Sequence, residues 1–91
     1  MFADPSTVAF RVWFVPESGI DQPPSVIGEV VGATAAAQIA LKYVYKDNDD
    51  QGTDMSYKPM HNFAIAALRS WANNPEWNIA VPVCYGCVVI A

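Results

Sequence analysis

Apolar and more polar positions alternate near the start of the chain, between Thr7 and Val15. One face of this segment is wholly apolar and consists of Val8, Phe10, Val12 and Phe14. A period of two predicts a β-strand whose apolar face belongs to the core. The opposite face is only half polar, since Trp13 lies there beside Arg11. We therefore expect this second face to be partly covered as well.

The next segment, PESGIDQPP, breaks regular structure, because it holds three prolines and a glycine in nine residues. SVIGEVV (Ser25–Val31) follows it and is predicted to be a second strand. Gly28 in its middle indicates a β-bulge.

Between Ala33 and Lys46 the pattern changes to that of a helix. Its polar residues recur every four positions and form one narrow stripe: Thr34, Gln38, Lys42 and Lys46. A helix at the surface of a two-layer domain shows a wider polar face than this. We interpret the narrow stripe as a helix covered on more than one side, which points to a partner subunit.

A second helix is predicted from Pro59 to Asn73. Proline suits the first turn, where its missing N–H leaves no bond unmade, and Asn73-Asn74-Pro75 ends the helix. The residues expected to be buried are Met60, Phe63, Ala64, Ala67, Leu68 and Trp71. Those expected on the exposed side are Asn62, Ala66, Arg69 and Asn73.

The last segment, EWNIAVPVCYGCVVIA (76–91), has the composition of strand. Pro82 argues for an edge position or a bulge. Tyr85-Gly86 is a candidate two-residue turn that folds the segment into a hairpin, and a single strand kinked at Gly86 is the alternative. The prediction is one α+β domain over 1–91, with the order β-β-α-α-β and the last element a strand or a hairpin. Its antiparallel or mixed sheet has three or four strands, and both helices pack on one face.

Composition adds an expectation about partners. Hydrophobic residues make up 53 % of the 91 residues and charged residues only 15 %, against roughly 25 % charged in typical soluble domains. A small monomer cannot easily hide so much apolar material, so we expect part of it to lie in a homo-oligomeric interface.

The charge excludes two other classes of partner. The net charge is −4, and five Lys and Arg residues are too few to form a basic stripe. We therefore expect neither nucleic-acid binding nor adhesion to an anionic membrane. The start of the chain, MFADPST, lacks the positive region of a signal peptide, and no apolar run reaches the about 20 residues that span a bilayer. A cytoplasmic location is the expectation.

KDNDDQGTD (46–54) holds four of the nine acidic residues and invites comparison with a calcium-binding EF-hand loop. Counted from Asp47, the chain has Asp at positions 1 and 3 and Gly at position 6. Position 12, however, is Lys58, a cation where calcium needs a bidentate carboxylate. We interpret the segment as a solvated connection between helices. A weak metal site remains the alternative, with the candidates Asp47, Asp49 and Asp50.

Cys84 and Cys87 form a CxxC pair. A zinc site lacks a second ligand pair, a redox pair lacks the helix that normally follows it, and a disulfide is poorly expected in a reducing compartment. We interpret both cysteines as small buried side chains of a strand. His61, the single histidine, is expected to be a surface or capping residue, with a Cys–His catalytic pair as the alternative.

Aromatic residues supply the interface candidates, because Trp and Tyr are enriched at interaction hot spots. Trp71 falls on the core stripe of its helix, whereas Tyr43 and Tyr45 lie on different faces of theirs and cannot both face one core. The candidates are Trp13, Tyr43 and Tyr45.

Taken together, the residues predict a non-catalytic interaction or structural module that acts as a homo-oligomer. An origin in a phage or other mobile element is a hypothesis that rests on the frequency of such short domains there, and not on these residues. The module binds itself, or another protein, and needs no cofactor. The alternative is a small-molecule-binding protein or small enzyme. Its pocket would lie between the sheet and the helices or at a subunit interface.

Overall fold

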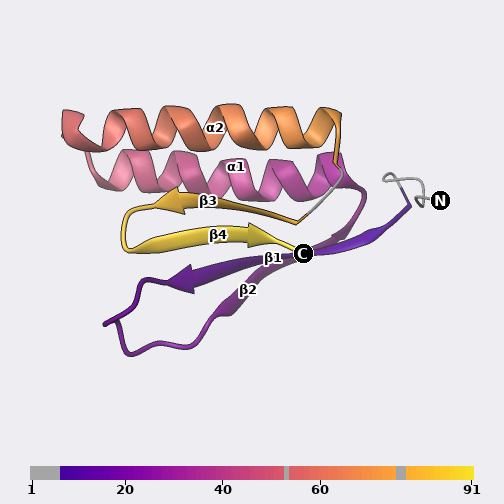
Figure 1. Ribbon diagram of the computed structural model, residues 1–91, viewed down its shortest axis with the longest axis horizontal. Helices are drawn as coiled ribbons and strands as arrows, with labels where there is room; N and C mark the ends of the chain where they lie inside the picture. Colours follow the sequence, from indigo (N-terminus) through magenta and orange to yellow (C-terminus); the bar gives the residue numbers. More distant parts are fainter. Residues whose placement is uncertain (1–6, 53, 76–77) are drawn as a thin grey trace.

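A computed structural model describes residues 7–52, 54–75 and 78–91. The chain forms a four-stranded antiparallel sheet with two helices on one face, in the order β-β-α-α-β-β (Figure 1). The strands are β1 (Ala9–Pro16), β2 (Ser25–Val31), β3 (Ile79–Val83) and β4 (Gly86–Ile90). The helices are α1 (Ala33–Asp50), the 3₁₀ turn η1 (Met55–Tyr57) and α2 (Lys58–Asn73). The predicted α+β fold is confirmed, with the hairpin as its last element.

The sheet has the order β2-β1-β4-β3, so the two hairpins meet where β1 pairs with β4. Both outer strands carry the features expected of edges. Pro82 lies on β3, where no further strand needs its missing N–H. Ile27 of β2 is an extra residue, because Val12 pairs with Gly28 and the next residue, Trp13, pairs with Val26. The predicted bulge is therefore present, one residue before Gly28.

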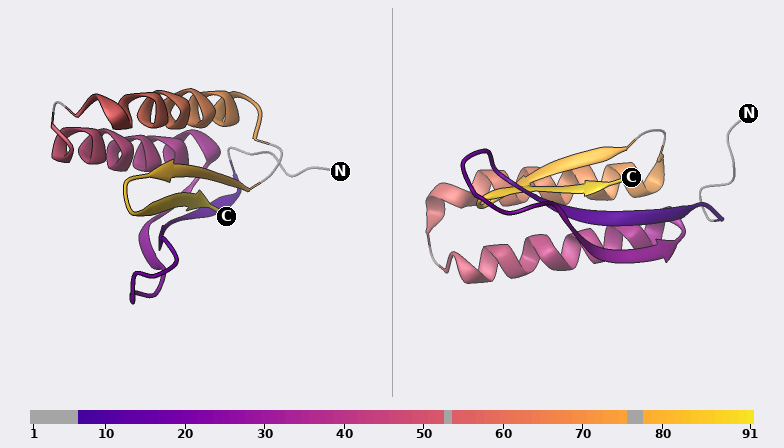
Figure 2. Two further views of the ribbon diagram at one scale, coloured as in Figure 1. Left: turned by 60° about the vertical axis from the view of Figure 1, so that its left-hand side comes forward. Right: turned by 90° about the horizontal axis from the view of Figure 1, so that it is seen from below.

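The core lies between the sheet and the helices. Val12 of β1 and Val88 and Ile90 of β4 are fully buried against Leu68 of α2 and Val44 of α1. α1 packs against α2 as well as against the sheet (Figure 2). Its four predicted polar residues are all exposed. The narrow polar stripe is therefore explained by coverage from within the same chain, and it does not require a partner subunit.

α1 extends four residues beyond its predicted end, so most of the acidic segment is the last turn of a helix and not a loop. No helix-breaking residue occurs before Gly52, whose φ of +63° is typical of a helix terminus. Asp54 caps the turn that follows, since its Oδ1 accepts the Ser56 N–H at 3.0 Å and the Ser56 hydroxyl at 2.7 Å. These bonds lower the pKa of Asp54, the hydroxyl bond contributing most.

α2 begins one residue before Pro59, and its buried residues are His61, Ala64, Leu68 and Trp71. The prediction was wrong at the first turns of this helix. Phe63, expected in the core, is 60 % exposed, whereas His61, expected at the surface, is 1 % exposed. The helix is therefore rotated relative to the predicted stripe where it faces α1.

The β3–β4 turn consists of Cys84 and Tyr85, one residue earlier than predicted. Val83 and Gly86 pair across it, and Tyr85 adopts a φ of +70°. Gly86 lies so close to the Val15 carbonyl that a side chain has no room there. The expectations that involve Glu76, Trp77 or the first six residues fall outside the described ranges. Neither described helix is long and apolar enough to cross a membrane.

Candidate functional site: an exposed apolar sheet face

Among the described residues, no helix or strand packs on one face of the sheet, because both helices lie on the other side (Figure 2). Since Val12, Val88 and Val81 face the core, the residues between them in each strand face outward. We call this surface the open face. Its apolar members are Ala9, Trp13, Val15, Val26, Val31, Ala80, Pro82, Cys87 and Val89.

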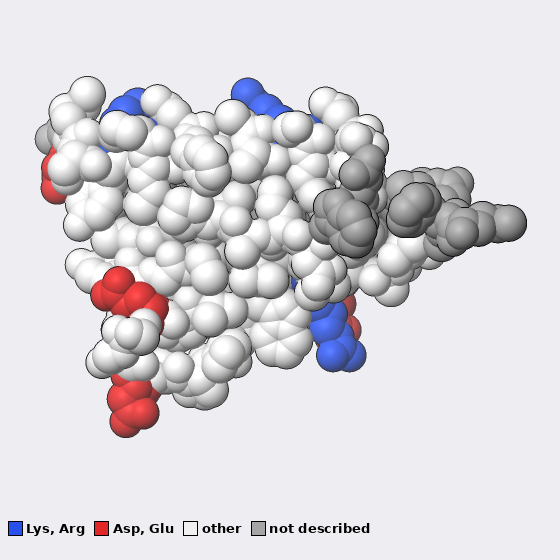
Figure 3. All heavy atoms as spheres, in the orientation of Figure 1, with Lys and Arg blue, Asp and Glu red and all other residues white. Residues whose placement is uncertain are grey.

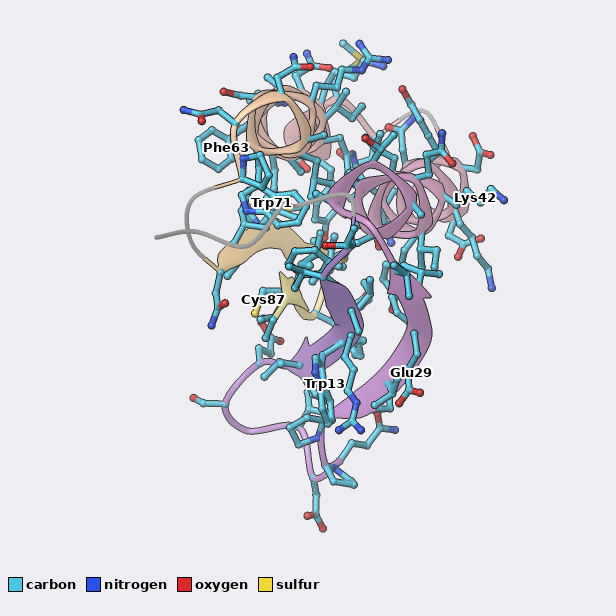
Figure 4. All side chains as sticks on the ribbon, turned by 90° about the vertical axis from the view of Figure 1, so that its right-hand side faces the viewer. Trp13, Glu29, Lys42, Phe63, Trp71 and Cys87 are labelled. Atoms are coloured by element: carbon cyan, nitrogen blue, oxygen red, sulfur yellow. The ribbon has the colours of Figure 1, made fainter. Side chains whose placement is uncertain are left out.

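Trp13 lies at the centre of the open face. It pairs with Val26 of β2 on one side and with Val89 of β4 on the other, and Val89 pairs in turn with Ala80 of β3. These four residues form an apolar row across all four strands, which we call the central row. Cross-strand neighbours of this kind have Cβ atoms about 5 Å apart and pack side by side. Figure 4 shows the Trp13 side chain directed away from both helices.

A second apolar row lies beside the first and consists of Val15, Cys87 and Pro82. Figure 4 shows that the Cys87 thiol also points away from the helices. Both cysteines are free thiols, and Cys87 is half-buried. Cys87 therefore belongs to the open face, whereas Cys84 lies in the hairpin turn. The expectation that both are buried strand residues is met only in part by each, since Cys84 is buried but in a turn and Cys87 is in a strand but half-buried.

The charged residues of the open face form an ion pair with one another. Arg11 Nε lies 3.0 Å from Glu29 Oε1 across the β1–β2 pair, and both side chains are 61 % exposed. A shallow hollow of about 500 Å³ opens at this end of the sheet, lined by Ala9, Phe10, Arg11, Glu29, Val30, Val31 and Ala91. The described part of the open face therefore carries no net charge. Figure 3 shows the molecule from the side, with the helices above the sheet as in Figure 1, and there too the charged side chains lie at the rim of the view around an uncharged middle.

A buried polar cluster lies where α1 ends and α2 begins. Asp47 Oδ2, in the last turn of α1, is 2.7 Å from Nε2 of His61 and accepts the backbone N–H of Cys84 at 2.9 Å. Since an ionised carboxylate only accepts, Nε2 carries the proton. One carboxylate thus joins α1, α2 and the β3–β4 turn.

Two further polar groups lie at this cluster, the second ring nitrogen of His61 and the hydroxyl of Tyr57. Nδ1 of His61 is buried and has no hydrogen-bond partner among the described residues. Tyr57 lies beside His61, with ring centroids 6.3 Å apart. Its pKa is raised chiefly by a hydrogen bond with the Cys84 side chain. His61 and Cys84 are both buried, and the shared carboxylate of Asp47 holds their two elements together as a structural clamp.

The three acidic residues predicted as weak metal ligands differ in their surroundings. Asp47 is engaged with His61 and Cys84, whereas Asp49 and Asp50 are exposed. Across the described ranges, no three His, Cys, Asp or Glu residues are placed to hold a metal ion.

The structure separates the three aromatic interface candidates. Trp13 is on the open face, and Tyr43 is half-buried with its ring 5.4 Å from that of Phe14. Tyr45 is 42 % exposed on the outer side of α1, where its hydroxyl accepts a hydrogen bond from Arg69 Nη2 at 3.1 Å. Only Trp13 therefore belongs to the open face.

Val26 and Val89, which flank Trp13, were not among the predicted site residues. The alternation of β1 indicated a half-apolar outer face, but strand order was needed to place these two residues beside Trp13. No protein-family model, curated protein or solved structure is significantly similar to the chain.

Proposed function

We propose that this protein is a non-catalytic interaction module that forms a homodimer through the open face of its sheet. The observation that carries this proposal is the central row, in which Trp13 lies between Val26 and Val89. A large aromatic residue surrounded by apolar neighbours has the composition of an interaction hot spot.

The size of the open face supports a dimer of modest affinity. Four strands about 4.8 Å apart and five residues long give a flat area of roughly 300 Å². A patch of this size is at the lower end of the largest apolar patch on typical monomers, which is about 300–600 Å² and often functional. Standard interfaces bury about 800 Å² on each partner, which is more than the open face offers. We therefore expect a weak dimer, with a dissociation constant in the micromolar range.

A second copy is a suitable partner because of charge. The chain carries a net charge of −4, and three acids, Asp47, Asp49 and Asp50, belong to the end of α1, which lies on the side of the sheet opposite the open face. The described open face holds one cation and one anion, Arg11 and Glu29. In a two-fold dimer the same surface of both copies forms the interface. Arg11 of one copy can therefore lie near Glu29 of the other, and two acidic chains can approach at this surface without net repulsion.

The test is light scattering after size exclusion, on the wild type and two matched variants. Val26→Lys places a charge in the central row, at a side chain that is already 42 % exposed. Gln38→Lys makes the same charge change on the exposed side of α1. We expect Val26→Lys to weaken dimerisation at least about tenfold and Gln38→Lys to leave it unchanged. A wild type that stays monomeric at about 1 mM contradicts the proposal.

A second candidate function is binding of a small ligand in the hollow near Arg11 and Glu29. Its volume of about 500 Å³ lies within the range of small-molecule sites, and the ion pair supplies polar groups of both signs. Native mass spectrometry of the purified protein distinguishes the two functions. A dimer without additional mass supports the interaction module, whereas a retained small molecule supports the second candidate.

A further inference from the structure

The outer edge of β2 is available for pairing. β2 is an edge strand, and within the described ranges it pairs with β1 alone. Ser25, Val26, Glu29 and Val31 are all exposed. An edge strand presents backbone N–H and C=O groups to which a further strand can bond.

α1 lies close above this edge. A Cβ atom placed on Gly28 would lie 2.8 Å from Cδ1 and 3.0 Å from Cγ2 of Ile39. The helix therefore approaches β2 as closely as it does because position 28 has no side chain. A groove lies beside this contact, between β2 and α1.

This groove has an apolar floor and a basic rim. Its volume is about 280 Å³, and it is lined by Ile27, Ile39, Lys42, Tyr43 and Lys46. Ile27, the bulged residue of β2, and Ile39 form the floor together with the Tyr43 ring, which is held in place against Phe14. The groove can thus receive one apolar side chain of a strand lying beside β2.

Two lysines define the charge of a partner. Lys42 and Lys46 are one helical turn apart, so their side chains lie on the same side of α1. Both are exposed, and neither has an ion-pair partner in the part of the chain that the structure describes. Beyond them a small hollow of about 80 Å³ is lined by Tyr43, Lys46, Asp47 and Asp50, so the charge changes sign there. An acidic residue of a ligand therefore fits over Lys42 and Lys46 but no further along the helix.

We propose that the groove between β2 and α1 binds an extended peptide segment of another protein by strand addition. The segment bonds to the β2 edge through its backbone, places an apolar side chain on Ile27, Ile39 and Tyr43, and places an acidic side chain two positions away against the lysines. Backbone bonds provide affinity in this mode, and alternate side chains provide specificity. The site is at the sheet edge and is separate from the open face.

A second copy of this chain is a poorer occupant. The described edge strands offer one acidic residue, Glu29, and its carboxylate is already paired with Arg11. The other edge strand, β3, carries Pro82, which interrupts backbone bonding. An acidic and apolar strand from a different protein matches the groove better.

The test titrates ¹⁵N-labelled protein with a synthetic peptide, acetyl-Thr-Glu-Thr-Val-Thr-Glu-Thr-amide, followed by NMR. The peptide sequence is a palindrome, so either strand direction presents the same Glu-Val-Glu face. We expect saturable shifts confined to β2 and to the part of α1 between Gln38 and Lys46. Amide exchange in β2 should slow when the peptide is bound, because added backbone bonds protect those amides. The matched peptide with Lys in place of Glu should bind at least about tenfold more weakly.

Variants separate the groove from general charge effects. Lys42→Glu should weaken binding roughly three- to tenfold, whereas Lys58→Glu, the same change at an exposed position of α2, should leave it unchanged. Absence of saturable shifts at millimolar peptide overturns the proposal. It is also overturned if the shifts fall on the open-face residues of β1 and β4, if the lysine peptide binds equally well, or if β2 exchange does not slow. Protection of β2 that depends on protein concentration without peptide would assign the edge to a second copy and overturn it too.

Discussion

Asp47 Oδ2 lies 2.7 Å from His61 Nε2, although the two residues are 14 positions apart and belong to different helices. The His61 side chain is 2 % exposed and the Asp47 side chain 11 %. Acids near the end of a helix oppose its dipole by a few tenths of a kcal/mol. Here the carboxylate offsets that cost by satisfying one buried donor on α2 and another in the β3–β4 turn.

Substituting Asp47 therefore destabilises the fold. Asp47→Ala leaves the His61 Nε2–H and the Cys84 N–H without an acceptor, and each unsatisfied buried donor costs about 1–3 kcal/mol. We expect urea unfolding to show a loss of about 2–4 kcal/mol. The control Asp49→Ala, at an exposed position of the same turn, should change the free energy of unfolding by less than about 0.5 kcal/mol. Equal losses in both variants would show that the clamp adds nothing.

The close approach of α1 to β2 predicts a coupling between two residues. Gly28→Ala should lower the free energy of unfolding by about 1–2 kcal/mol, because its Cβ meets Cδ1 of Ile39 at 2.8 Å. Ile39→Val removes that methyl group. In the Ile39→Val background the same Gly28→Ala change should therefore be milder by at least about 0.5 kcal/mol. Denaturant unfolding of the four proteins measures this coupling, and strictly additive losses would contradict the packing described here.

Stability should decline in alkaline solution through Tyr43. Burial, and then the charges of Asp47 and Asp50, raise the pKa of Tyr43. A raised folded-state pKa means that the unfolded chain releases this proton first. The contribution of Tyr43 to stability is thus complete below the unfolded pKa of about 10, and it is lost as the pH rises from there through the folded value.

Urea unfolding between pH 8 and pH 11 checks this expectation. Tyr43→Phe should show a smaller decline than the wild type across that range. Tyr45→Phe changes an exposed ring on the same helix. Its free energy of unfolding should fall with pH as that of the wild type does. If the free energy of unfolding falls equally steeply with pH in Tyr43→Phe and in the wild type, Tyr43 is not the cause of the alkaline decline.

Thiol reactivity reports on the open face. Cys87 is half-buried on this face, whereas Cys84 is 6 % exposed. In dilute protein, iodoacetamide should modify Cys87 faster than Cys84. As the protein concentration rises and the dimer forms, the modification rate of Cys87 should fall, whereas that of Cys84 should not change. Peptide mass spectrometry measures both rates, and Val26→Lys should abolish the dependence on concentration. A Cys87 rate that is independent of concentration in a dimeric wild type would place the interface elsewhere.

Much of the fold could be predicted because the local signals are strong. The alternation of β1 separates Val12 from Trp13, and the regular spacing of Lys42 and Lys46 identifies the exposed side of α1. Pro82 indicated an edge position or a bulge, and the strand that carries it, β3, is an edge strand. These features depend on neighbours in sequence, which a single chain displays directly.

The errors occur where distant residues decide the outcome. Phe63 and His61 both fit a helical stripe that contains Ala64, Leu68 and Trp71. His61 is buried because Asp47 of α1 supplies its partner, and nothing near it in the sequence reveals this bond. The central row was missed for the same reason, since the row depends on strand order and not on local pattern.

The most direct test of the central claim is an NMR dilution series of the ¹⁵N-labelled protein, with translational diffusion recorded at each concentration. The open face is predicted to mediate self-association. Diffusion should therefore slow with concentration, and the amides whose shifts change should be those around Trp13, Val26, Cys87 and Val89. A constant diffusion coefficient up to about 1 mM, or shifts gathered instead around the exposed Phe63 of α2, would contradict it.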